Sequence, residues 1–82
     1  MLETTVASVK SLETRLAAVF VQTAGKFKSK ILLRVDNRTA DAKSIMGVIS
    51  LSVLDGADVV IITDGEDEKT AAEELSSLLL SL

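Results

Sequence analysis

The chain has 82 residues, which indicates one domain (residues 1–82), and 48% are hydrophobic, nearly all aliphatic, since Phe20 and Phe27 are its only aromatic residues. Its net charge of −3 argues against direct nucleic-acid binding, which needs a basic face, and the absence of cysteine excludes disulfides and a thiol nucleophile. The absence of histidine removes the commonest general base and metal ligand, so the composition indicates neither an enzyme nor a metal or cofactor site.

Taken in chain order, the first elements are a strand and a helix. Residues 2–9 are rich in threonine and valine and predict a strand. Residues 14–25 predict a helix, because apolar residues recur at helical spacing at Ala17, Phe20, Val21 and Ala24. We expect Thr14 to cap the start of this helix and Gly25 to end it in the left-handed conformation.

A hairpin and a short helix follow. Residues 30–35 and 38–42 predict two strands joined by a turn at Asp36-Asn37. Residues 44–52 predict a short helix with Ser44 as its N-cap. A glycine and several β-branched residues inside this segment suit a strand equally well, so the two assignments stay open.

The last third of the chain predicts a strand and a helix. Residues 58–63 form a continuous apolar run, which is typical of a central strand. Residues 67–82 predict a helix, with a solvated acidic start at Glu66-Asp67-Glu68 rather than a metal site. Its apolar stripe consists of Ala71, Leu75, Leu78, Leu79 and Leu82. The element order is β-α-β-β-α-β-α, and the economical arrangement is one sheet with the helices on one face.

The sequence also indicates the cellular location of the protein. Its apolar runs are far shorter than the roughly 18–20 residues that span a bilayer. Its first ten residues lack the basic region of a signal peptide. We therefore expect a cytoplasmic protein with no membrane partner, and a monomer, with a dimer as the alternative.

Two motifs carry a resemblance to a known family. Residues 11–18 read SLETRLAA and residues 42–51 read AKSIMGVISL, while GEDE follows at residues 65–68. With this element order, the chain resembles the histidine-containing phosphocarrier (HPr) family of the bacterial sugar phosphotransferase system. The resemblance implies an α+β fold, the HPr-like open-faced β-sandwich, in which three helices cover one face of a four-stranded antiparallel sheet.

The first motif departs from the family where the family's chemistry lies. The family reads G-L-H-T-R-P-A-A, and its histidine accepts a phosphoryl group from Enzyme I and passes it to sugar permeases. Glu13 stands at the histidine position, and Ser11 and Leu16 replace the glycine and the proline. A carboxylate forms only a labile acyl phosphate, so we expect no histidine phosphocarrier activity. In this the chain is similar to the Crh-like members, which lack the histidine and act as regulators.

The resemblance implies roles for residues of both motifs. In the family, the serine matching Ser44 is phosphorylated by a dedicated serine kinase, and the product binds the catabolite control repressor. Residues matching Ile45, Met46 and Ile49 form a docking surface, and the arginine matching Arg15 contacts the phosphoryl group and partner proteins. Other interpretations stay open: Ser44 as only a helix cap, the three apolar residues as core, and Arg15 as a solvated charge paired with Glu13.

Three functional hypotheses follow for the whole chain. The first is a regulatory protein of carbon catabolite repression, controlled at Ser44 and acting on a repressor or a metabolic enzyme. The second is an altered phosphocarrier that uses Glu13. The third is an interaction domain without phosphorylation. At Glu13 itself, the acid is either drift after loss of the relay or a partial imitation of phosphohistidine.

Overall fold

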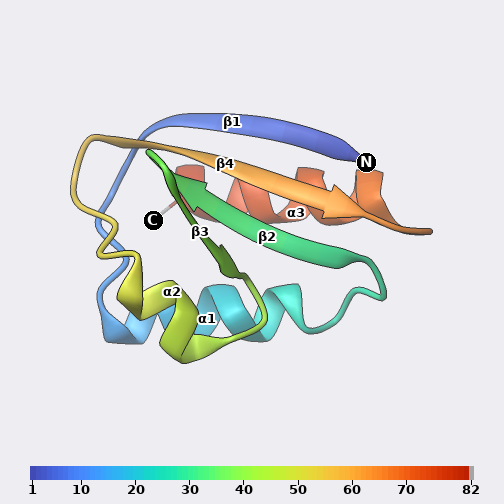
Figure 1. The fold of residues 1–82 in the computed structure, drawn as a ribbon, viewed down its shortest axis with the longest axis horizontal. Coiled ribbons are helices and arrows are strands. Elements are labelled where there is room, and N and C mark those ends of the chain that lie inside the picture. Colours follow the sequence, from blue (N-terminus) through green and yellow to red (C-terminus); the bar gives the residue numbers. More distant parts are fainter. Residues whose placement is uncertain (82) are drawn as a thin grey trace.

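The sheet is antiparallel and places the last strand of the sequence near its centre. The computed structural model describes residues 1–81. Strands β1 (Leu2–Val9), β2 (Lys30–Val35), β3 (Arg38–Asp41) and β4 (Ala57–Asp64) lie in the order β1-β4-β2-β3 (Figure 1). The predicted hairpin is β2–β3, and the apolar run that predicted a central strand is β4, paired on both sides.

Three helices cover one face of this sheet, as Figure 1 shows. They are α1 (Thr14–Ala24), α2 (Ile45–Ser50) and α3 (Glu68–Ser81). Helix α3 lies against β1 and β4, α2 packs beside β3, and α1 lies between the other two helices. The predicted element order and the α+β open-faced sandwich are therefore confirmed. No helix within residues 1–81 combines the length and apolar composition needed to cross a membrane.

The core is aliphatic and lies between the sheet and the helices. Alternation along β4 buries Val59 and Ile61, whereas Val60 and Ile62 on the opposite face stay half-buried. The helices contribute the stripes that their spacing predicted, namely Ala17, Phe20 and Ala24 of α1 and Ala71, Leu75 and Leu79 of α3. Ala72 is a buried member that the predicted stripe omitted, and Leu82 lies outside the described residues.

The ends of α1 differ from the prediction. The N-cap is Glu13 rather than Thr14, with extended backbone angles of φ −72° and ψ 171° and no capping hydrogen bond from its side chain. Gly25 follows the helix with φ −64° and ψ −16°, which is right-handed backbone rather than the expected left-handed cap. The chain therefore leaves α1 through a continued right-handed turn, in which the Gly25 N–H donates to the Val21 carbonyl.

Helix α2 is shorter than the predicted span of residues 44–52. It ends at Ser50, and Leu51 is its C-cap. The next residue, Ser52, adopts φ 52°. This left-handed conformation is unfavourable for a residue with a Cβ atom, and it turns the chain out of the helix. The apolar residues on either side, Leu51 and Val53, are both buried, so core packing holds Ser52 in this conformation.

Asp67 connects the start of α3 to the segment before β2. Its carboxylate accepts hydrogen bonds from the Lys28 and Ser29 N–H groups, each at 2.9 Å, and from the Ser29 hydroxyl. These bonds, led by that of the Ser29 hydroxyl, lower the pKa of Asp67 from 3.8 to about 2. The acidic run is thus more than a solvated helix start, because this member is a structural clamp. Gly65 lies against the same serine, where a Cβ atom would come within 2.6 Å of the Ser29 Oγ.

The backbone at Ser52 yields a stability prediction. Ser52→Gly should raise the free energy of unfolding by about 0.5–1 kcal/mol, because relief of the left-handed strain outweighs the added freedom of the unfolded chain. Ser50→Gly, in the last turn of α2, is the matched control and should lower stability instead. Urea unfolding of both variants measures the difference, and a destabilised Ser52→Gly protein would contradict this account.

The clamp at Asp67 yields a pH prediction. A carboxyl group whose pKa is lower in the folded than in the unfolded chain stabilises the fold at pH values above its ordinary pKa. For Asp67, this stabilisation is lost as the pH falls from 3.8 to about 2. Asp67→Asn should therefore lower the thermal midpoint at neutral pH, and the gap to the wild type should narrow as the pH falls through that window. Glu66→Gln at an exposed neighbouring position is the control. A gap that stays constant down to pH 2 would refute the clamp.

Candidate functional site

The first motif begins in a short loop before α1 that backbone contacts hold in place. The Ser11 N–H donates to the Asp55 carboxylate at 2.7 Å, and the Leu12 N–H donates to the Val53 carbonyl at 3.1 Å. The Leu12 side chain is buried beneath the loop. Glu13 therefore follows an anchored segment, and its side chain is exposed at the N-terminus of α1.

The partner of this loop is the segment that joins α2 to β4. Besides the two contacts above, the Gly56 N–H donates to the Val9 carbonyl at 2.8 Å. At the left of Figure 1 the loops before α1 and after α2 accordingly run side by side. The structure thus joins the first motif to the segment that directly follows the second motif. Sequence reasoning missed the role of Asp55, and its only signal was the turn expected at Asp55-Gly56.

Arg15 lies in the first turn of α1 with its side chain exposed. The ion pair with Glu13, which was one open interpretation of Arg15, does not form, because the four salt bridges within residues 1–81 involve other groups. Both side chains point into solvent as separate charges on one exposed surface, where each can meet a partner molecule.

Ser44 is the N-cap of α2, as predicted. Its backbone is extended, and its Oγ accepts a hydrogen bond from the Gly47 N–H at 3.2 Å. The side chain is half-buried. Gly47, the glycine that weakened the helix prediction, lies where α2 approaches β3, since a Cβ atom there would come within 3.4 Å of the Ala40 Cβ. The strand alternative for this segment is therefore excluded.

Hydrogen bonds hold the turn that leads from β3 into Ser44. The Asp41 carboxylate accepts from the Lys43 N–H at 2.8 Å, and the Asp41 carbonyl accepts from the Ser44 N–H at 3.0 Å. The Lys43 ammonium donates to the Phe27 carbonyl at 2.6 Å, which ties this turn to the segment after α1. The roles of Asp41 and Lys43 were not predicted from the sequence. An acid three residues before a predicted N-cap was the available signal for the turn.

The three apolar residues of the second motif differ in exposure. The Met46 side chain is 70% exposed, whereas Ile45 and Ile49 are half-buried and pack against the core. Met46 therefore presents an exposed apolar side chain two residues after Ser44. The two isoleucines have mixed roles, because each supports the core on one side and reaches the surface on the other.

Within residues 1–81, no group of three or more acidic side chains is arranged to hold a metal ion. The pKa of Glu68 is lowered by the hydrogen bond from the Gly65 N–H and by the N-terminal amine. That amine lies 3.2 Å from the Glu68 carboxylate, so this acid serves to anchor β1 beside α3.

Comparison with known proteins agrees with this geometry. The family model described as the PTS HPr component phosphorylation site matches residues 2–81. The HPr-like protein Crh of Bacillus subtilis is 47% identical over 66 residues, covering 80% of this chain and 78% of that protein.

Two solved structures show the same fold. The HPr-C-His crystal structure from Thermoanaerobacter tengcongensis superposes with a TM-score of 0.92 at 43% identity, covering 99% of this chain and 93% of that one. A crystal structure of B. subtilis Crh, a domain-swapped dimer, superposes with a TM-score of 0.81 at 42% identity, covering 89% and 84%. By sequence motifs, element order and superposition, the chain belongs to the HPr family of the phosphotransferase system.

Proposed function

We propose that this chain is an HPr-like regulatory protein of carbon catabolite repression, that it has no histidine phosphocarrier activity, and that phosphorylation of Ser44 controls it. Its partners would be the serine kinase of the HPr type and the catabolite control repressor or a metabolic enzyme, in the cytoplasm. The observation that carries the proposal is the combination of a family fold with a chain that contains no histidine. Similarity to Crh supports the regulatory class.

Glu13 supports the loss of the relay. It occupies the position of the family's histidine at the N-terminus of α1, exposed and without a hydrogen bond that would orient it. An imidazole nitrogen is a good nucleophile at neutral pH, whereas a carboxylate is a weak one unless it is activated. Arg15 does not contact Glu13, so nothing within residues 1–81 holds this acid for phosphoryl transfer.

The position of Ser44 suits a regulatory phosphate. Its Oγ acts as an acceptor toward the Gly47 N–H, and an ester oxygen or a phosphate oxygen can accept the same bond. A phosphate there adds a charge of about −1.5 to −2 at the N-terminus of a helix, where negative charge is favourable. Phosphorylation would thus leave the fold intact and change the surface potential beside Met46.

The docking surface in this proposal consists of Arg15, Ile45, Met46 and Ile49. Met46 supplies an exposed, adaptable apolar contact, and Arg15 supplies an exposed positive charge on the neighbouring helix. A phosphate on Ser44 would place negative charge beside the apolar contact. A partner that contacts both the phosphate and the apolar surface can therefore bind the phosphorylated form more tightly than the unmodified form.

The first test is the phosphoryl donor. Incubation with the HPr-type serine kinase and ATP should add one phosphate by intact-protein mass spectrometry. Ser44→Asn should abolish this gain while keeping the helix cap, because asparagine caps as well as serine does. Ser50→Ala, which removes a hydroxyl from the same helix, should still gain the phosphate.

The same assay separates the alternatives. Labelling by phosphoenolpyruvate and Enzyme I, lost in Glu13→Gln, would instead establish an altered phosphocarrier. No label from either donor would leave an interaction domain without phosphorylation, and Ser44 would then be only a helix cap. A label from ATP alone supports the regulator, a label from phosphoenolpyruvate alone supports the altered carrier, and a label from both contradicts the loss of phosphocarrier activity.

A second test addresses the docking surface. Met46→Ser should weaken binding of the phosphorylated chain to the catabolite control repressor by about tenfold, because a buried methionine side chain contributes about 1.5 kcal/mol or more. Leu80→Ser is the matched control, since Leu80 is equally exposed at 70% but lies on α3. Calorimetric titration measures both. Equal affinities for the two variants would remove Met46 from the interface.

A further inference from the structure

The two edges of the sheet are built differently. Strand β3 is a short edge of four residues, and it carries charged side chains at both ends, Arg38 and Asp41. Strand β1 is an edge of eight residues, paired only with β4. Its other side leaves main-chain N–H and C=O groups without a strand within residues 1–81.

Strand β1 lacks most features that protect an exposed edge. The chain has no proline, and β1 has no lysine and no charged side chain on the core-facing positions. Its one charge, Glu3, lies on the open face of the sheet and pairs with Arg34 at 3.3 Å. An irregularity in the pairing interrupts the strand between Val6 and Val9, where Ser8 has φ 54°. The regular stretch before it therefore remains open to pairing.

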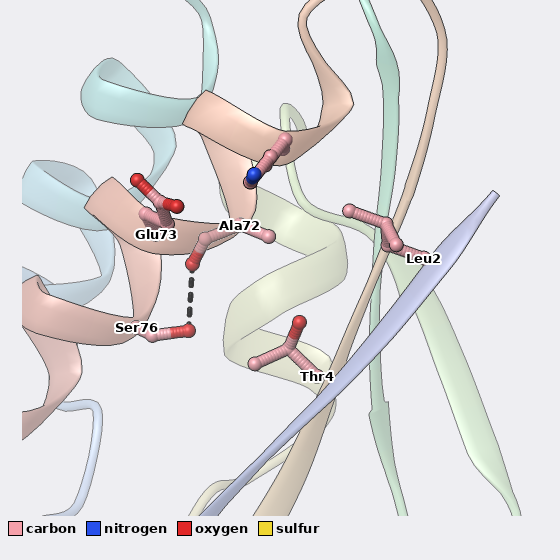
Figure 2. A pocket seen from close by; sticks show the side chains of 6 residues that line it. Leu2, Thr4, Ala72, Glu73 and Ser76 are labelled. Atoms are coloured by element: carbon pink, nitrogen blue, oxygen red, sulfur yellow. Dashed lines mark hydrogen bonds between the residues drawn. The ribbon is translucent and has the colours of Figure 1, made fainter.

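A pocket lies directly beside this open stretch, between β1 and α3. Figure 2 shows Leu2 and Thr4 of β1 facing Ala72 of α3 across it. The Ser76 hydroxyl on the α3 side donates to the Ala72 carbonyl at 2.6 Å, so this polar group is already satisfied. The pocket volume is about 270 Å³. That volume is below the usual range of small-molecule sites, about 300–1,000 Å³, and it suits a single side chain.

We propose that β1 and this pocket form a docking site for an extended segment of another protein, which adds to the sheet as a fifth strand. Side chains of an added strand alternate between the two faces, so one of them projects to the helix side. An apolar side chain there would enter the pocket between Thr4 and Ala72. Main-chain hydrogen bonds to β1 would supply affinity, and the pocket would select the apolar residue.

A second copy of this chain that pairs its β1 with this β1 fits the site less well. If two β1 strands paired with each other, their helix-side residues would be Leu2, Thr4 and Val6 of each copy. These residues already belong to each copy's own core or line its own pocket. Such a pair would leave both pockets unfilled. A segment that is not already part of a sheet has a free side chain to insert.

Charged side chains at the rim of the pocket add a second requirement for the bound segment. Lys69 and Glu73 line it from α3, one helical turn apart. Neither takes part in a salt bridge within residues 1–81. The site therefore fits a segment in which charged residues of both signs flank the apolar anchor. This surface lies on α3 and β1, away from Ser44 and Met46 on α2, and it is independent of the proposed regulation.

The test is selection from a phage-displayed library of random peptides on the full chain. A synthetic copy of the most enriched peptide is then titrated into isotope-labelled protein. We expect enriched peptides with alternating apolar positions, and shifts of the backbone amide signals in β1 and in the first two turns of α3. Ala72→Leu fills the pocket and should lower the affinity by about tenfold or more. Ser77→Leu adds the same group at an exposed position of α3 and should change it by less than about twofold.

Leu2→Glu is a second pocket variant, because Leu2 is 36% exposed and tolerates substitution better than a core residue. It should weaken the peptide as Ala72→Leu does. The proposal is overturned if no peptide is enriched, if the enriched peptides bind the pocket variants as tightly as the wild type, or if the shifts map to α1 and α2. Self-association in sedimentation that Ala72→Leu abolishes would identify a second copy as the occupant instead.

Discussion

The arrangement of this molecule depends on a sheet that can bury only one of its faces. The described chain supplies three helices, and their apolar stripes suffice to cover one side of four strands. Alternation along each strand then sorts the residues into core-facing and open positions. The features of the proposed regulation follow from this sorting, because both motifs lie in the helical layer, whose outer surface a partner can reach.

Beside the helical layer, hydrogen bonds join the first motif to the segment that follows the second motif. The loop before α1 hydrogen-bonds to the segment after α2 through Val53 and Asp55. Glu13 and Met46 thus belong to helices whose flanking segments are hydrogen-bonded to each other. One bond joins two main-chain groups, and the other joins a main-chain N–H to the Asp55 carboxylate. Preorganised backbone of this kind lowers the conformational entropy that a docking partner would otherwise have to remove.

The sequence predicted the elements well because hydrophobic spacing reports which face is buried. The stripes of α1 and α3 and the central position of β4 all follow from spacing alone. The ends of the helices were predicted less well from the sequence. Gly25 after α1 is right-handed, whereas Ser52 after α2 adopts the left-handed conformation. The clamp at Asp67 was not predictable, because it depends on Ser29, thirty-eight residues earlier in the chain. In the site, Ser44 as a cap was predictable from local rules, whereas the tether at Asp55 required the tertiary fold.

The pairing of β1 with β4 has a consequence for how the chain folds as it is synthesised. Leu2 pairs with Thr63, so the first strand must wait for most of the chain before it finds its partner. The β2–β3 hairpin closes through neighbouring residues and can form early. A topology dominated by such distant pairing folds more slowly than a helical bundle of the same length. During that interval β1 remains unpaired, and Val6 and Val9, which the folded chain buries, stay open to a chaperone.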